Sequence, residues 1–157
     1  MSHLRVLHDP EPTLRAPSKD VAVSDIGSPR LQTLIEDMVE TMKLENGVGI
    51  AAPQVGTNER VIIVEGGRGP EAFFNPRIVG KSFGKVDSEE GCLSVPGVFG
   101  IVKRHKKVKV EAYDKTATKR VMDVHGFPAI IFQHEIDHLD GVLFVDKVVK
   151  YTQPPKL

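Results

Sequence analysis

Two histidines four residues apart, His134 and His138, flank a glutamate in the stretch 134–138. On a helix, residues at this spacing lie on one face about one turn apart, so both imidazoles can reach one metal ion. Glu135 between them can act as general base toward a water at that metal. The alternative is that two helical histidines simply lie beside other polar residues. The pattern therefore predicts a hydrolytic metal site and leaves its third ligand open.

A catalytic site of this kind needs three protein ligands and one open coordination position. Downstream of His138 the sequence holds no further histidine, glutamate or cysteine. One class of zinc proteases carries a ligand three residues beyond the glycine that follows the helix, but here that place holds Phe144. The third ligand is therefore upstream, or it is one of two poorly placed aspartates, Asp140 and Asp146.

The stretch 90–94, Glu-Gly-Cys-Leu-Ser, offers the single cysteine of the chain as the upstream ligand. A thiolate binds divalent transition metals strongly, and Gly91 beside it lets backbone approach a substrate closely. A lone cysteine is more often a small buried apolar residue. Beside a two-histidine helix that lacks a third ligand, the metal interpretation of Cys92 is favoured. One cysteine cannot form an internal disulfide, which indicates a reducing compartment.

A third stretch, 47–54, reads Gly-Val-Gly-Ile-Ala-Ala-Pro-Gln. Its two glycines and two alanines leave a backbone nearly bare of side chains, which suits pairing with an extended peptide. Gln54 adds a neutral amide donor that can stabilise a developing oxyanion without competing for a metal. The alternative is a helix end followed by a tight turn. That alternative explains Gly47 but not the pairing of Gly49 with Gln54.

Two helices are expected to position these residues. Ser28 and Pro29 give an N-cap and a first-turn proline, and apolar residues then recur at helical spacing, which predicts an amphipathic helix over 29–45. A second helix is predicted to begin at Pro128 and to end at Gly141, and it carries the two histidines. Short strands are predicted between the helices, at 60–65, at 71–79, around Val86 and twice within 101–124.

The N-terminal segment is expected to be irregular. Residues 1–27 carry several prolines and predict an arm that lies across the domain, and the tail 148–157 is short, with a Pro-Pro pair that excludes helix at its end. Strands followed by a late core helix favour the α+β class. We expect small antiparallel or mixed sheets packed around a central C-terminal helix, in a single domain over 1–157.

Composition excludes several classes of protein. The chain has 157 residues, 40% of them hydrophobic and 27% charged, with 21 basic and 21 acidic residues, so it is neither disordered nor strongly charged. This balance gives no global field that favours nucleic acid or anionic membrane. The longest apolar runs are too short to span a bilayer. The basic cluster 103–107, with Lys109, is interpreted as a solvated strand edge that resists aggregation rather than as an RNA contact.

The three segments that carry candidate functional residues, taken together and in this order, resemble the peptide deformylase family. That family is marked by GxGLAAxQ, EGCLS and QHExDHLxG stretches, which are matched here by 47–54, 90–94 and 133–141. Ile50 stands where the family has leucine, a change that keeps the side-chain volume. The segment 6–10, Val-Leu-His-Asp-Pro, also resembles the opening of the family. The likeness runs from residue 4 to residue 147.

The resemblance implies roles for the matched residues. Cys92, His134 and His138 are expected to bind the metal, with Glu135 as general base and then general acid. Cys/His/His ligation does not select one metal. The family characteristically uses Fe(II) and tolerates Zn(II), Ni(II) or Co(II), so one divalent ion is expected here, Fe(II) in the cell.

Further roles come from the same resemblance. Gln54 and the backbone N–H of Leu93 are expected to stabilise the oxyanion. Glu90 matches a family carboxylate that pairs with an arginine, here Arg104. The formylated peptide and its methionine side chain are expected to lie against the substrate-binding residues Val48, Gly49, Ile50, Gly91, Phe127, Ile130 and Ile131.

The implied activity is removal of the formyl group from the N-formylmethionine of newly made polypeptides, with release of formate. The expected protein is cytoplasmic and monomeric, with no membrane partner and no specific nucleic acid partner. A transient ribosome contact is left open. The chain finishes soon after Asp146, so the long C-terminal helix by which some relatives are thought to dock is not expected here. The alternatives are a related deacylase or small peptidase, and an inactive metal-binding or peptide-binding relative.

Overall fold

The structure is a computed structural model that describes residues 2–156. This range holds two α-helices, eight strands and four short 3₁₀ turns. In chain order they are η1 Pro12–Leu14, η2 Val23–Asp25, α1 Pro29–Leu44, β1 Gly49–Ala51, η3 Ala52–Val55, β2 Val61–Gly66, β3 Gly69–Lys81, β4 Lys85–Cys92, β5 Val95–His105, β6 Lys107–Tyr113, β7 Lys119–His125, α2 Phe127–Leu139, η4 Phe144–Asp146 and β8 Val148–Gln153.

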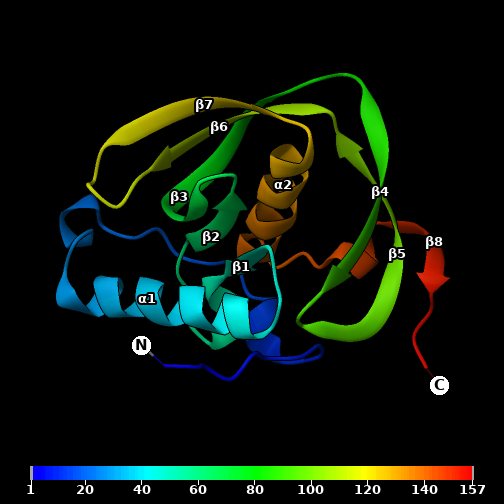
Figure 1. Cartoon of the computed structure of the whole chain (residues 1–157), viewed down its shortest axis with the longest axis horizontal. Coiled ribbons are helices and arrows are strands. Elements are labelled where there is room, and N and C mark those ends of the chain that lie inside the picture. Colours follow the sequence, from blue (N-terminus) through cyan, green and yellow to red (C-terminus); the bar gives the residue numbers. More distant parts are fainter. Residues whose placement is uncertain (1, 157) are drawn as a thin grey trace.

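The strands form two sheets, and α2 lies between them (Figure 1). One sheet has five strands in the order β1-β2-β3-β6-β7, and the other has three in the order β4-β5-β8. All pairings between these named strands are antiparallel. The α+β class is therefore confirmed, with antiparallel sheets around the helix that carries the two histidines.

Strand β2 explains why helices cover both faces of the five-stranded sheet. Because successive side chains of a strand point to opposite faces, its four buried apolar residues divide between two cores. Ile62 and Val64 pack with α2, whereas Val61 and Ile63 pack with α1. The site-bearing helix is thus held by a sheet that is buried on both sides.

The two helices begin and end close to where the sequence predicts. Ser28 Oγ accepts a hydrogen bond from Leu31 N at 3.4 Å, and α1 ends at Leu44, one residue before the predicted end. Helix α2 stops before Gly141, which has a φ of 76°. A Cβ at Gly141 would lie 2.3 Å from the backbone oxygen of Arg15, so only glycine fits there.

Two strands were not predicted from the sequence, and a third begins earlier than predicted. The stretch 47–54 contains the short strand β1, where the sequence predicted only a backbone nearly bare of side chains. The tail contains β8, which pairs with β5. Strand β5 begins at Val95, six residues before the predicted pair of strands. In each case the strand lacks the regular apolar alternation on which the prediction depended.

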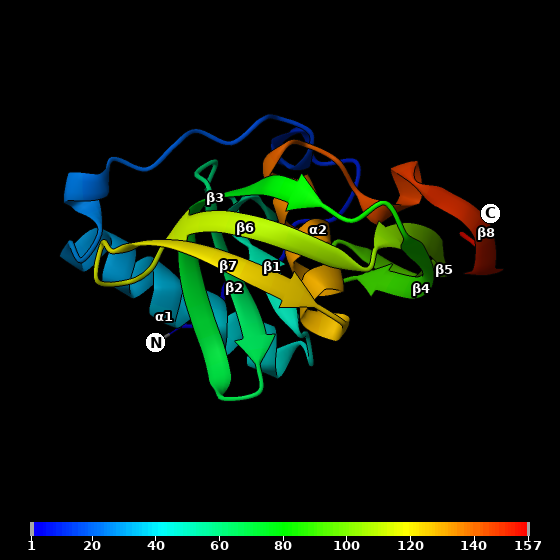
Figure 2. The ribbon, with the colours of Figure 1, turned by 90° about the horizontal axis from the view of Figure 1, so that it is seen from above.

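The N-terminal segment runs along one side of the molecule to the start of α1 (Figure 2). Backbone hydrogen bonds attach it at three points: Leu7 N donates to Gln54 O, Asp9 N to Ser94 O, and Ser18 N to Leu139 O. All three acceptors lie within the stretches 47–54, 90–94 and 133–141, which carry the candidate functional residues, so the arm braces the site. Neither helix in the described range is long and apolar enough to cross a membrane.

Candidate metal centre and active site

The three predicted metal ligands meet at one point. Cys92 ends β4, and His134 and His138 lie one turn apart on α2. One donor atom from each residue lies within 4.8 Å of the other two, and Cys92 Sγ is 3.3 Å from His138 Nε2. A thiolate and two imidazoles fit a divalent transition metal, and three ligands leave one coordination position open.

His134 is held from behind by a buried carboxylate. Its Nδ1 lies 2.9 Å from Glu90 Oε1, which leaves Nε2 for the metal. Arg104 donates to both oxygens of Glu90, at 2.8 and 2.7 Å, and to Asp137 at 2.7 Å. Burial raises the pKa of Glu90, but the hydrogen bonds from Arg104 and His134 outweigh burial and hold that pKa at about 2. This network fixes the orientation of the His134 ring.

Glu135 lies between the two histidines but in a different environment. Its side chain is 4% exposed, and its buried Oε1 has no hydrogen-bond partner within residues 2–156. Burial raises the pKa of Glu135 to about 7. Gly49 of β1 leaves room for it, because a Cβ there would lie 2.6 Å from Glu135 Oε2. A carboxyl group whose pKa lies near neutrality can both accept a proton and return it.

Gln54 presents its amide N–H to the same centre. Its Oε1 accepts a hydrogen bond from Ala51 N at 2.9 Å, which fixes the orientation of the amide. Its Nε2 then lies 3.1 Å from Ser94 Oγ and 3.6 Å from Cys92 Sγ. A neutral donor is thereby placed beside the thiolate, where an oxyanion can be stabilised.

A cavity of about 680 Å³ opens over these residues. It lies between β1 and β4, and each of these strands is at the edge of its sheet. An edge strand carries unpaired backbone N–H and C=O groups that can pair with an extended peptide. The predicted residues that line the cavity are Val48, Gly49, Gln54, Glu90, Gly91, Cys92, Leu93, Phe127, Ile130, Ile131, His134 and Glu135.

Comparison with known proteins identifies the family. A family profile described as polypeptide deformylase matches residues 3–154. The chain belongs to the polypeptide deformylase family. The peptide deformylase of Acetivibrio thermocellus is 45% identical over 146 residues, which cover 93% of this chain and 84% of that protein. The peptide deformylase of Desulforudis audaxviator is 41% identical, with 94% of each chain covered.

Solved deformylase structures share the fold as well as the sequence. A class I type b peptide deformylase from Acinetobacter baumannii superposes with a TM-score of 0.91 at 40% identity, covering 94% of this chain and all of that one. The enzyme from Thermotoga maritima gives a TM-score of 0.90 at 37% identity, covering 94% and 99%. The chain is therefore an enzyme of the deformylase type, and Cys92, His134 and His138 form the metal site typical of that family.

Within this deformylase fold, one predicted substrate residue lies apart from the cavity. Ile50 is fully buried between β2 and α1, in the core on the far side of the sheet. Gly49 and Val48, its neighbours, do line the cavity. The alternation of side chains along β1 explains the difference, because residues 49 and 50 face opposite ways.

Two functional neighbours were missed from the sequence. Ser94 accepts a hydrogen bond from Gln54 Nε2, and Asp137 completes the ion pairs of Arg104. Ser94 belongs to the quoted family stretch 90–94, which was the available signal. Asp137 lies three residues after His134 on α2, but nothing in the spacing alone indicates that it meets Arg104 of β5.

Proposed function

We propose that this enzyme removes the formyl group from the N-terminal formyl-methionine of newly made polypeptides and releases formate. The observation that carries the proposal is the grouping of three metal-ligating atoms, an unpartnered buried carboxylate and an oriented amide donor at one end of a peptide-sized cavity. Such a grouping supports hydrolysis of an amide bond at a peptide terminus.

We further propose that Cys92, His134 and His138 hold one divalent ion, Fe(II) in the cell, with Zn(II), Ni(II) or Co(II) able to replace it. When bound, the ion supplies Lewis acidity that makes a water nucleophilic near neutral pH. Glu90 and Arg104 keep the His134 ring in place through the hydrogen bond at Nδ1.

Glu135 moves the proton in this proposal. Its carboxylate takes a proton from the attacking water and returns it to the nitrogen that leaves as the free amine. Gln54 Nε2 and the backbone N–H of Leu93 donate to the oxygen that becomes negative when water attacks the formyl carbon. The burial of Glu135 and the fixed amide of Gln54 support these assignments.

The peptide is proposed to lie between the two edge strands. Its backbone extends β1 at Gly49 and faces Gly91 of β4, and its methionine side chain lies against Val48, Phe127, Ile130 and Ile131. Ile50 keeps the register of β1 from the core side. One A. baumannii deformylase of the same fold was solved with Met-Ala-Ser bound (TM-score 0.89, 38% identity, covering 94% of this chain and all of that one), which supports a peptide of this kind.

The proposed partners follow from this activity. The substrate is a nascent polypeptide with a formylated methionine, which places the enzyme in the cytoplasm, and a transient ribosome contact is compatible with this. All the proposed site residues come from one chain, so a monomer is sufficient.

The test is formate release from purified protein whose metal content is measured in the same preparation. Formyl-Met-Ala should be hydrolysed, and acetyl-Met-Ala should react far more slowly. Formyl-Asp-Ala serves as the control for the methionine pocket, because an apolar wall disfavours a carboxylate. Equal rates on the formyl and acetyl peptides would reject the formyl preference.

A further inference from the structure

The turn that joins β3 to β4 displays a phenylalanine entirely to solvent. The relative exposed area of Phe83 is 103%, the largest among the exposed large apolar residues of the described range. Two other exposed phenylalanines, Phe99 and Phe127, line the active-site cavity, but Phe83 does not. The Phe83 ring packs neither in the core nor in the catalytic cavity, so its exposure points to another role.

The turn is braced, so the ring is held in place at its base. Ser82 N donates to Lys107 O at 2.9 Å, and Lys106 N donates to Gly84 O at 3.0 Å. Ser82 O lies 2.7 Å from His105 Nδ1. The chain passes between the two sheets twice here, from β3 to β4 and from β5 to β6. These hydrogen bonds join the two connections.

Four lysines lie on the turn or beside it. Lys81 and Lys85 flank the turn in sequence, and Lys106 and Lys107 are bonded to it through their backbones. The stem of Lys106 lies over Gly84, where a Cβ would be 3.5 Å from Lys106 Cδ. We call Phe83 and these four lysines the Phe83 surface.

The lysines of the Phe83 surface are free of internal partners. All four are exposed, and within residues 2–156 none has a carboxylate within 4.0 Å of its ammonium group. The other lysines on these strands are paired, since Lys103 of β5 pairs with Asp87 and Lys109 of β6 with Asp123. The whole chain has equal numbers of basic and acidic residues, so this local excess is not a consequence of composition.

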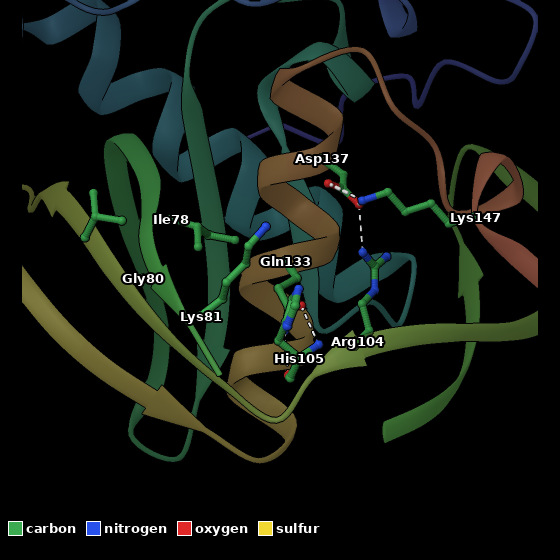
Figure 3. A pocket seen from close by; sticks show the side chains of 9 residues that line it. Ile78, Gly80, Lys81, Arg104, His105, Gln133, Asp137 and Lys147 are labelled. Carbon is green, nitrogen blue, oxygen red and sulfur yellow. Dashed lines mark hydrogen bonds and ion pairs between the residues drawn. The ribbon is translucent and has the colours of Figure 1, made fainter. Parts of the chain in front are cut away.

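A second cavity, of about 360 Å³, adjoins this surface and is lined by Lys81 and His105 (Figure 3). Lys81 and Lys147 extend toward it from opposite sides, and Arg104 also lines it (Figure 3). Asp137 is the one carboxylate that lines this cavity, and it is already bonded to Arg104 and Lys147. Arg104 is also paired with Glu90, so Lys81 is the residue through which the positive charge of the Phe83 surface reaches this recess.

We propose that the Phe83 surface binds a single-stranded segment of RNA, with a base stacked on the Phe83 ring and the flanking phosphates bound by the four lysines. For Lys106 and Lys107 this replaces the interpretation of the cluster 103–107 as a solvated strand edge, because the exposed ring beside them could not be seen in the sequence. An exposed aromatic ring among cations matches the alternation of bases and phosphates in an unpaired strand. A membrane surface fits less well, because a single ring flanked by lysines offers little apolar area to bury. The choice of RNA rests on the proposed function, since newly made polypeptides are produced beside RNA.

The test uses the full chain and a fluorescein-labelled oligouridylate of about 12 nucleotides, with binding followed by anisotropy over a range of salt concentrations. Phe83→Ala and Phe83→Leu should each weaken binding by about 5- to 100-fold, because a base loses its stacking partner. Phe83→Tyr keeps the ring and should bind within about twofold of the wild type. Tyr151→Ala, an exposed aromatic on β8, is the matched control and should bind normally.

The charge is tested separately. The double variant Lys106→Gln, Lys107→Gln should reduce the slope of log affinity against log salt by about 1.4, since each phosphate contact on a single strand contributes about 0.7. Lys103→Gln with Lys119→Gln removes two internally paired lysines and should leave the slope nearly unchanged. Formate release from formyl-Met-Ala should stay at the wild-type rate in every variant, which reports an intact fold and catalytic site.

Three results would overturn the proposal. The first is wild-type oligouridylate affinity in Phe83→Ala. The second is equal affinity for fully paired RNA of the same length, whose bases are not free to stack on a side chain. The third is binding to vesicles of anionic phospholipid in the absence of oligouridylate binding. None of these results bears on formate release, so the proposed enzymatic function would stand or fall on its own test.

Discussion

Two buried carboxylates, Glu90 and Glu135, are neighbours of His134. One is bonded to a cation and, within residues 2–156, the other is not. Glu90 is 6% exposed and bonded to Arg104 and His134, and its pKa lies at about 2. Glu135 is 4% exposed, one of its oxygens has no partner within residues 2–156, and its pKa lies at about 7. Nearly equal burial therefore gives a permanent anion in one case and a titratable group in the other.

Hydrogen-bond partners, rather than burial, therefore determine which carboxylate stays charged and which can carry a proton. Burial disfavours the charged form of both carboxylates. Arg104 reverses this effect at Glu90, whereas no cation within residues 2–156 bonds Glu135 directly. Glu90 can thus hold a metal ligand in position, and Glu135 can carry a proton. The following variants test that division.

The largest effect is expected from Glu135→Gln. The amide keeps the shape of the side chain but has no basic oxygen, so turnover of formyl-Met-Ala should fall by about 10²- to 10⁴-fold. Glu135→Ala should fail by a similar factor. Circular dichroism should show an unchanged fold in both. Near-normal turnover in either variant would mean that the proton is moved by another group.

Removing Arg104, the cation that pairs with Glu90, should lower the free energy of unfolding. Arg104→Met leaves the buried Glu90 without its bidentate partner, and breaking such a buried pair costs about 3–5 kcal/mol. Arg120→Met is the matched control, because Arg120 pairs with Glu71 at the surface and its loss should cost less than about 1 kcal/mol. Urea unfolding at pH 7 measures both. Similar losses in the two variants would contradict a structural role for the buried pair.

A smaller effect on catalysis is expected from Gly49→Ala. The new Cβ would lie 2.6 Å from Glu135 Oε2 and 2.9 Å from Ile131 Cγ2, so the carboxylate must shift. A displacement of this size should lower kcat/KM by about 10- to 100-fold. Gly67→Ala is the control, since a Cβ there meets nothing within 4 Å. If the two alanine variants had the same kcat/KM, the position of Glu135 would not matter.

The last effect concerns stability in acid. The pKa of Glu90 is lowered from 4.5 to about 2 in the fold, so its ion pair stabilises the protein above pH 4.5, and this stabilisation is lost as pH falls toward 2. The difference in free energy of unfolding between wild type and Glu90→Gln should therefore shrink between pH 4.5 and pH 2. A difference that stays constant over this range would contradict the low pKa.

Much of the candidate site could be predicted from the sequence because its residues lie in compact stretches. The spacing of His134 and His138 requires a helix to bring them together, and the structure provides it. The absence of a later histidine, glutamate or cysteine favoured Cys92, and its Sγ meets the two histidines. These inferences depended on local geometry and on counting ligands, and both are properties of the sequence.

What the sequence could not predict depends on packing between distant segments. Strand β8 is mostly exposed on both faces, so it carries no apolar alternation, and only its pairing with β5 defines it. Arg104 stands in a basic cluster that was interpreted as solvated, yet it is 2% exposed because Glu90 and Asp137 meet it from β4 and α2. The exposure of Phe83 likewise depends on how the β3–β4 and β5–β6 connections pack together, which the sequence does not show.

The most direct test is the metal content of two variants purified and assayed together with the wild type. The account assigns the ligands to Cys92, His134 and His138 and makes Glu135 a proton carrier that does not bind the metal. Glu135→Gln should therefore hold one metal ion per chain, as the wild type does, while Cys92→Ala should lose tight binding because two histidines alone leave the ion under-coordinated. Full metal occupancy in Cys92→Ala, or loss of the metal from Glu135→Gln, would contradict the account.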